Sequence, residues 1–149
     1  MLRVDTLSYQ RTLECKAADF FAALMKEQLR YFQSKDRTIK KIVPGIQVHS
    51  YLQTKMNKQV ADSTIEVGEI IPNEKLELIT HHTHGKIYQT YELIQTSKGQ
   101  QRIKYSETNE LMQMRNQLSL LFTLPIYKLI YNKNTKRRMQ YLERIAQNN

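Results

Sequence analysis

The sequence predicts an α+β domain in which one antiparallel sheet of about six strands packs against two helical regions. Three observations lead to this fold class. A strand-like segment is followed at once by an amphipathic helix. Five further segments then alternate apolar and polar residues and are separated by short turn sequences, so consecutive strands are expected to pair antiparallel. The last part of the chain returns to helical spacing, and no linker or repeat interrupts it, so residues 1–149 are predicted to form one domain.

The first two elements are predicted from their apolar spacing. Residues 4–13 place Leu7, Tyr9 and Leu13 on one side of a strand. Residues 16–35 carry apolar residues three and four positions apart, which is typical of an amphipathic helix: Ala17, Phe20, Phe21, Leu24, Leu29 and Phe32.

Five hairpin strands are expected between the two helical regions. Turn signals at Pro44-Gly45, residues 55–59, Pro72-Asn73, Gly85 and residues 97–101 separate them. The alternating segments themselves cover residues 46–53, 60–70, 75–84, 86–96 and 102–111. Such a sheet buries one face, and only the two helical regions are available to cover it.

The C-terminal helical region has two candidate interruptions. An apolar stripe begins around Leu118 and continues beyond Pro125, which favours a kink or a break. The polar stretch at residues 132–135 is the second candidate, with Asn134 or Thr135 as the N-cap of a last helix. One long kinked helix and two separate helices both fit this pattern. The final segment places Met139, Leu142, Ile145 and Ala146 on one face.

Composition limits the classes of function. The formal net charge of +9 favours attraction to anions, with denser basic runs at Lys35–Lys41 and Lys133–Arg138. No zinc-finger or RNA-binding motif accompanies this charge, so no specific nucleic-acid partner is predicted. The single cysteine, Cys15, and the lack of a signal-type apolar run indicate a cytoplasmic protein. The longest apolar stretch, Leu118–Tyr131, is too short to span a bilayer, so no stable membrane insertion is expected.

The order of elements resembles that of the START-like superfamily, also called polyketide cyclase-like, SRPBCC or helix-grip. The local match is "TLECKAADFFAAL", Thr12–Leu24, which is similar to the first strand and helix of that superfamily. Lys16-Ala17-Ala18 stands where a proline is usual, and "YELIQTSKGQQRIKYSETNE" is a partial match to its later strands. The resemblance implies a curved sheet wrapped around a long C-terminal helix with a cavity between them, in a small bacterial branch. The superfamily includes polyketide cyclases, lipid-transfer domains and plant allergens, so the fold alone does not assign an activity.

The sequence "HHTHG" at residues 81–85 holds three of the four histidines. On a strand His82 and His84 share one face, while His81 points to the other. A zinc site needs three or four ligands, and the third would have to come from His49, Glu107 or Glu110. The prediction is therefore the end of a strand with His82 as a polar group at a cavity rim, and no metal or cofactor.

The predicted function is non-catalytic binding of a small hydrophobic or lipid-like ligand between the sheet and the C-terminal helix. Tyrosines at positions 9, 91 and 105 are expected on the helix-covered side, as core residues or as pocket walls. The candidate site residues are Phe20, Leu24, Leu78, His82, Tyr91, Tyr105, Asn109, Phe122 and Leu129.

Two alternatives remain open at this point. A cyclase or hydrolase would use His82, His84 or Glu107 inside the cavity with a shifted pKa. An interaction protein would form a homodimer through Leu118–Tyr131 or bind an anionic surface through Lys133–Arg138. Cys15 is expected to be structural, because no base is adjacent, although a helix N-terminus is able to lower a thiol pKa.

Overall fold

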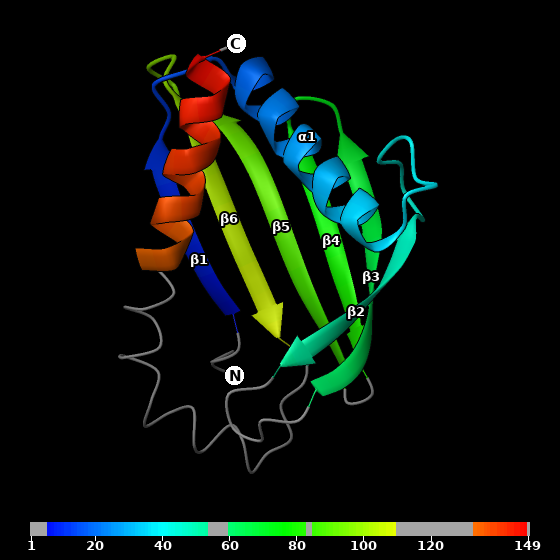
Figure 1. Cartoon of the computed structure of the whole chain (residues 1–149). Helices are drawn as coiled ribbons and strands as arrows, with labels where there is room; N and C mark the ends of the chain where they lie inside the picture. The colour runs from blue at the N-terminus through cyan, green and yellow to red at the C-terminus, as the bar shows by residue number, and fades with distance from the viewer. Residues whose placement is uncertain (1–5, 54–59, 83–84, 110–132, 149) are drawn as a thin grey trace.

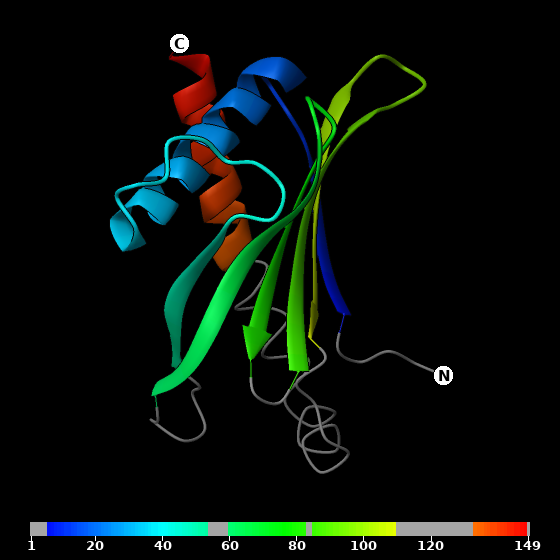
Figure 2. The same cartoon turned by 90° about the vertical axis from the view of Figure 1, so that its right-hand side faces the viewer.

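A computed structural model of the chain describes residues 6–53, 60–82, 85–109 and 133–148 (Figure 1). A six-stranded antiparallel sheet curves around two helices that lie on the same face of it, as the two views in Figures 1 and 2 agree. This architecture confirms the predicted α+β helix-grip fold.

The strands and the first helix lie close to their predicted positions. In chain order they are β1 (Thr6–Thr12), α1 (Ala17–Lys35), β2 (Gln47–Gln53), β3 (Val60–Ile71), β4 (Lys75–His82), β5 (Gly85–Gln95) and β6 (Gln101–Asn109). Residues 133–147 form the C-terminal helix. The predicted turn at residues 55–59 and the apolar stretch at Leu118–Tyr131, which includes Phe122 and Leu129, lie outside the described residues.

The sheet order is β1-β6-β5-β4-β3-β2. Strands β2 to β6 follow one another as hairpins, whereas β1 pairs antiparallel with β6, with Thr6 opposite Thr108. Helix α1 therefore carries the chain from one edge of the sheet to the other, and in doing so it covers the inner face (Figure 1). The pairing of the first strand with the last did not follow from the sequence pattern.

Successive side chains along each strand point alternately to an inner face, which the helices cover, and to an outer face. One row of the inner face runs across four strands through Tyr9, Tyr105, Tyr91 and Leu76, because each residue stands opposite the next. Tyr105 and Leu76 are fully buried and Tyr91 is nearly so. The predicted inward orientation of these tyrosines is thus confirmed.

The C-terminal helix places a buried stripe against the sheet, formed by Thr135, Met139, Leu142 and Ala146. The sequence predicted a break at 132–135 with Asn134 or Thr135 as the N-cap of the last helix. Residue 133 is already helical, so neither Asn134 nor Thr135 is the N-cap. An N-cap has non-helical backbone angles, and Thr135 instead belongs to the inward stripe of the helix. No described helix is long and apolar enough to cross a bilayer.

A buried ion pair joins this helix to the edge strand β1. Arg11 Nε lies 3.4 Å from Glu143 Oε2, and the side chains of the two residues are 22% and 6% exposed. Both residues therefore lie largely out of water, between the helix and the sheet.

Candidate functional site

The inner face of the sheet changes from apolar to polar along its strands. The apolar part packs against α1 and the C-terminal helix and includes Val67, Leu76 and Ile103. Toward the β4–β5 turn, the inward positions carry polar side chains instead: Ser63, Thr80, Gln89 and Glu107. A buried face of a sheet is normally apolar, so this polar end needs a specific explanation.

Three side chains of this polar end form a hydrogen-bond chain. Gln89 and Glu107 stand opposite each other on β5 and β6. The Gln89 Nε2 group donates to the Tyr105 hydroxyl at 2.8 Å, and that hydroxyl donates to Glu107 Oε2 at 3.0 Å. Tyr105 is fully buried, whereas Gln89 and Glu107 are half-buried.

An arginine from the C-terminal helix covers the two tyrosine rings. The Tyr91 and Tyr105 ring centroids are 4.9 Å apart, and their planes are tilted by 53°. The guanidinium carbon of Arg138 lies 4.6 Å from the centre of the Tyr105 ring and 5.9 Å from that of Tyr91, although part of this side chain stays exposed. These are cation–π distances. We call Gln89, Tyr91, Tyr105, Glu107 and Arg138 the Tyr105 cluster.

Arg138 is the one residue of the predicted basic run Lys133–Arg138 whose guanidinium lies over the Tyr105 ring among the described contacts. Lys133, Lys136, Arg137 and Arg138 are all exposed in part, but the guanidinium of Arg138 reaches the rings of Tyr91 and Tyr105 on the sheet.

Both tyrosines of the cluster keep their protons at neutral pH. Burial raises the pKa of Tyr105, and the nearby charge of Glu107 raises it further. Burial also raises the pKa of Tyr91, although the charge of Arg138 opposes that shift. The protonated Tyr105 hydroxyl therefore donates to Glu107 while it accepts from Gln89.

The structure brings some of the predicted site residues together. Tyr91 and Tyr105 are in ring contact, and Leu78 stands opposite Gln89 on the neighbouring strand. Phe20 and Leu24 lie in the packed core between α1 and the sheet. A role in ligand binding remains a prediction for all of them.

His82 and Asn109, the two residues predicted to supply polar groups to the site, are the last residues of β4 and β6. His82 pairs with Ser63 and Asn109 pairs with Ile87, so the register assigns both residues to the inner face. Their side chains are not described, and Phe122 and Leu129 lie outside the described residues.

Gln89 and Glu107 belong to the Tyr105 cluster but were not predicted as ligand contacts. The sequence contained a weak signal for each of them. Gln89 occupies an inward position two residues before the buried Tyr91, where strand alternation calls for an apolar side chain. Glu107 follows Tyr105 by two residues in the same way. A polar residue in phase with buried neighbours was thus the available signal.

His81 lies on the outer face of the sheet, opposite to the Tyr105 cluster. Its Nε2 is 2.7 Å from Glu66 Oε1 across strands β4 and β3. The predicted alternation, with His81 and His82 on different faces, agrees with the register. Among the side chains that the structure describes, no three His, Cys, Asp or Glu residues gather closely enough to hold a metal ion.

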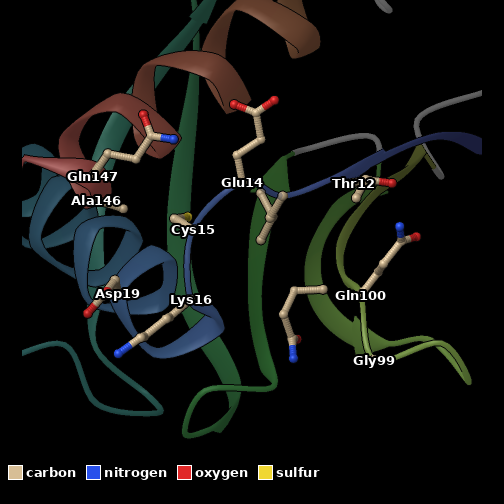
Figure 3. Close-up of a pocket in the computed structure, with 11 residues that line it drawn as sticks. Thr12, Glu14, Cys15, Lys16, Asp19, Gly99, Gln100, Ala146 and Gln147 are labelled. Atoms are coloured by element: carbon tan, nitrogen blue, oxygen red, sulfur yellow. The ribbon is translucent and has the colours of Figure 1, made fainter.

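A surface hollow of about 610 Å³ lies at the other end of the sheet (Figure 3). The start of α1, the β5–β6 turn and the end of the C-terminal helix line it, with Glu14, Lys16, Asp19 and Gln147 among its walls. A second hollow of about 610 Å³ adjoins the β3–β4 turn at residues 72–75. Both are polar and wide open, and neither includes a residue of the Tyr105 cluster.

Cys15 lines the first hollow, but its thiol is not activated. Burial raises the pKa of Cys15 to about 11, with further upward contributions from the charges of Glu143 and Asp19. The pKa is thus raised, and not lowered as the alternative for the start of α1 expects, because burial and the charges of Glu143 and Asp19 disfavour the thiolate. At neutral pH the thiol stays protonated, which makes it a poor nucleophile.

The match to a family model decides the relationship of the chain. The model described as "Domain of unknown function (DUF3284)" matches residues 8–128, from β1 to beyond β6. The chain belongs to the DUF3284 family. Among curated proteins, none matches this DUF3284 sequence.

Solved structures share the fold of this DUF3284 protein at low sequence identity. Protein MLL2253 from Mesorhizobium loti has a TM-score of 0.59 at 13% identity, with 96% of this chain and 97% of that chain covered. Ara h 8.0201 has a TM-score of 0.55 at 12% identity, with 97% and 98% covered. DynU16, a protein of the dynemicin biosynthetic locus, has a TM-score of 0.58 at 11% identity, with 93% and 47% covered. These likenesses show that the chain shares its fold with the three proteins.

Proposed function

We propose that this DUF3284 domain binds a small amphiphilic ligand between the inner face of the sheet and the C-terminal helix, without catalysing a reaction. In this proposal the apolar body of the ligand lies along the sheet near Leu78 and Tyr91. Its polar group meets the Tyr105 cluster. The observation that carries the proposal is the hydrogen-bond chain from Gln89 through Tyr105 to Glu107, which lies on the inner face beside the apolar core.

The hydrogen-bonding capacity of Glu107 supports a polar partner at this position. A carboxylate accepts about four hydrogen bonds. Among the described residues, Glu107 accepts one, from Tyr105. It is half-buried on the inner face, where unmet polar groups are costly. A ligand hydroxyl or amine would satisfy the remaining acceptor positions.

Arg138 supplies the complementary charge. In the described part of the chain, its contacts are the two tyrosine rings and the Tyr105 hydroxyl, and no carboxylate lies within ion-pair distance. An acceptor group on the ligand would pair with its guanidinium. Few convergent polar groups beside an apolar wall are the usual composition of a small-molecule site. The shared fold of the START-like superfamily adds support of a general kind.

The first test is native mass spectrometry of the purified protein, followed by denaturation of the same sample. We expect a mass excess that disappears on denaturation and corresponds to an organic molecule. Binding of the fluorescent probe 1-anilinonaphthalene-8-sulfonate then measures the site directly.

Paired variants locate the site. Tyr105→Phe and Arg138→Gln should each weaken probe binding by roughly tenfold, which corresponds to one lost polar interaction. Tyr88→Phe on the outer face and Arg137→Gln on the exposed side of the helix should leave it unchanged. The proposal would be overturned by a folded protein that carries no mass excess and binds no probe. It would also be overturned if each control variant weakened probe binding as much as the variant it is paired with.

A further inference from the structure

The helix side of the molecule carries most of the exposed positive charge. Here the helix layer means α1, the segment 36–46 that follows it, and the C-terminal helix. Its exposed basic residues are Lys26, Arg30, Lys35, Arg37, Lys40, Lys41, Lys133, Lys136, Arg137, Arg138 and Arg144. Among the acidic residues described in this layer, Asp36 is exposed, Asp19 and Glu27 are half-buried, and Glu143 is buried in its ion pair.

The acidic residues gather on the other side of the molecule. Strands β3, β4 and β5 and the β3–β4 turn carry Glu66, Glu69, Glu74, Glu77 and Glu92. Both helices lie on the opposite face of the sheet from the outward side chains of these strands (Figure 2). These carboxylates are accompanied by Lys75, Lys86, Lys98, Arg102 and Lys104 on β4, β5, β6 and the β5–β6 turn, so the described sheet side is nearly balanced in charge, whereas the helix layer is strongly basic.

Large apolar side chains are exposed within the same basic layer. Tyr31 on α1 is 39% exposed, Val43 after α1 is 38% exposed and Tyr141 on the C-terminal helix is 47% exposed. The ammonium group of Lys35 lies 5.8 Å from the centre of the Tyr31 ring. Tyrosine rings beside lysine and arginine are the combination that favours the boundary between lipid headgroups and acyl chains.

We infer that the helix layer docks on the surface of an anionic lipid bilayer, as a peripheral contact that does not insert a helix. The positive charge would adsorb to anionic headgroups, and Tyr31, Val43 and Tyr141 would enter the headgroup region. A bilayer fits better than a nucleic acid, because the basic residues are spread over two helices and the segment after α1, and exposed Tyr31, Val43 and Tyr141 belong to the same three parts of the chain. This inference does not depend on the proposed ligand.

Vesicle sedimentation with two matched triple variants tests the docking. The first variant, Lys26→Gln with Lys40→Gln and Lys136→Gln, changes the helix layer. The control, Lys86→Gln with Lys98→Gln and Lys104→Gln, changes β5, β6 and their connecting turn. Each removes three positive charges from the +9 of the chain.

The full chain should bind vesicles of phosphatidylcholine mixed with phosphatidylglycerol, should not bind pure phosphatidylcholine, and should dissociate as salt rises. The helix-layer variant should bind at least about tenfold more weakly, since each basic side chain near an anionic surface contributes on the order of fivefold. The control should change less than about threefold. Tyr31→Ser with Tyr141→Ser should weaken vesicle binding at constant charge.

Three results would overturn the inference. Equal losses in the two triple variants would show that only net charge matters. Failure of the full chain to bind the anionic vesicles at low salt would show that the helix layer is not a membrane-binding surface. Tighter binding to duplex DNA or RNA than to vesicles at the same salt, weakened by the same helix-layer variant, would assign the layer to nucleic acid instead.

Discussion

The guanidinium carbon of Arg138 lies 4.6 Å from the centre of the Tyr105 ring, and this contact joins the C-terminal helix to the middle of the sheet. Its neighbour Arg137 has the same chemistry and is also exposed, but among the described contacts none joins it to the ring of Tyr91 or Tyr105. The two residues therefore form a matched pair for measuring the effect of the ring contact of Arg138.

Arg138→Gln should lower the free energy of unfolding by about 1–2 kcal/mol, because it removes a cation–π contact that is partly withdrawn from water. Arg137→Gln should change it by less than about 0.5 kcal/mol. Urea unfolding followed by circular dichroism measures both values. Equal effects of the two substitutions would contradict an inward role for Arg138.

Tyr105→Phe should cost about 1–2 kcal/mol, because it removes the hydroxyl that accepts from Gln89 and donates to Glu107 without changing the volume of the ring. Tyr88→Phe, on the outer face of the same strand pair, is the matched control and should be nearly neutral. Combining Tyr105→Phe with Gln89→Leu in a double-mutant cycle isolates the Gln89–Tyr105 bond. Strict additivity in that cycle would show that the bond contributes nothing to stability.

Arg11→Met should lower stability by about 2–4 kcal/mol, since it leaves the carboxylate of Glu143 buried without its partner. Adding Glu143→Leu should restore most of the loss, because the unpaired charge is then gone. Arg30→Met is the control: Arg30 and Glu27 are 3.5 Å apart, but the Arg30 side chain is 68% exposed. That exposed pair should contribute less than about 0.5 kcal/mol. A double variant that is no more stable than Arg11→Met would contradict the explanation.

The thiol of Cys15 should alkylate slowly at pH 8, because its pKa is raised from 9.0 to about 11 and the reactive thiolate is rare there. The rate of iodoacetamide labelling is followed by mass spectrometry. In the folded protein this rate should rise toward pH 11, whereas in the urea-unfolded protein it should already rise near pH 9.

The raised pKa of Cys15 also predicts a loss of stability at alkaline pH. Between pH 9 and 11 the unfolded chain has released the thiol proton while the folded chain still binds it, so the free energy of unfolding falls as pH rises through this window. Cys15→Ser should flatten that part of the pH dependence. A full-rate reaction of the folded thiol at pH 8 would contradict the raised pKa.

Local periodicity was sufficient to predict most of the fold. Leu76 and Leu78 alternate with charged residues, and the spacing from Phe20 to Phe32 defines the buried side of α1, so element type and orientation followed from neighbouring residues. The pairing of β1 with β6 was not predictable in this way, since it joins segments that are distant in the sequence.

The candidate site was less predictable than the fold. Tyr91 and Tyr105 were found through their inward register, but Arg138 looks the same in sequence as the exposed Arg137 beside it. Only the phase of the C-terminal helix, fixed by Met139 and Leu142, separates the two. Gln89 was missed because a polar residue in a strand is ordinarily placed in water.

Because Thr6 stands opposite Thr108, the sheet gains its last strand only when the most distant segments of the described sheet meet. Such a pairing closes a very long loop and raises the contact order, which slows folding. During synthesis β1 leaves the ribosome roughly a hundred residues before β6, which takes on the order of ten seconds at typical elongation rates. Throughout that interval Leu7 and Leu13, both buried in the finished protein, have no β6 to pack beside. The pairing of β1 therefore has to wait until translation has passed Asn109, the last residue of β6.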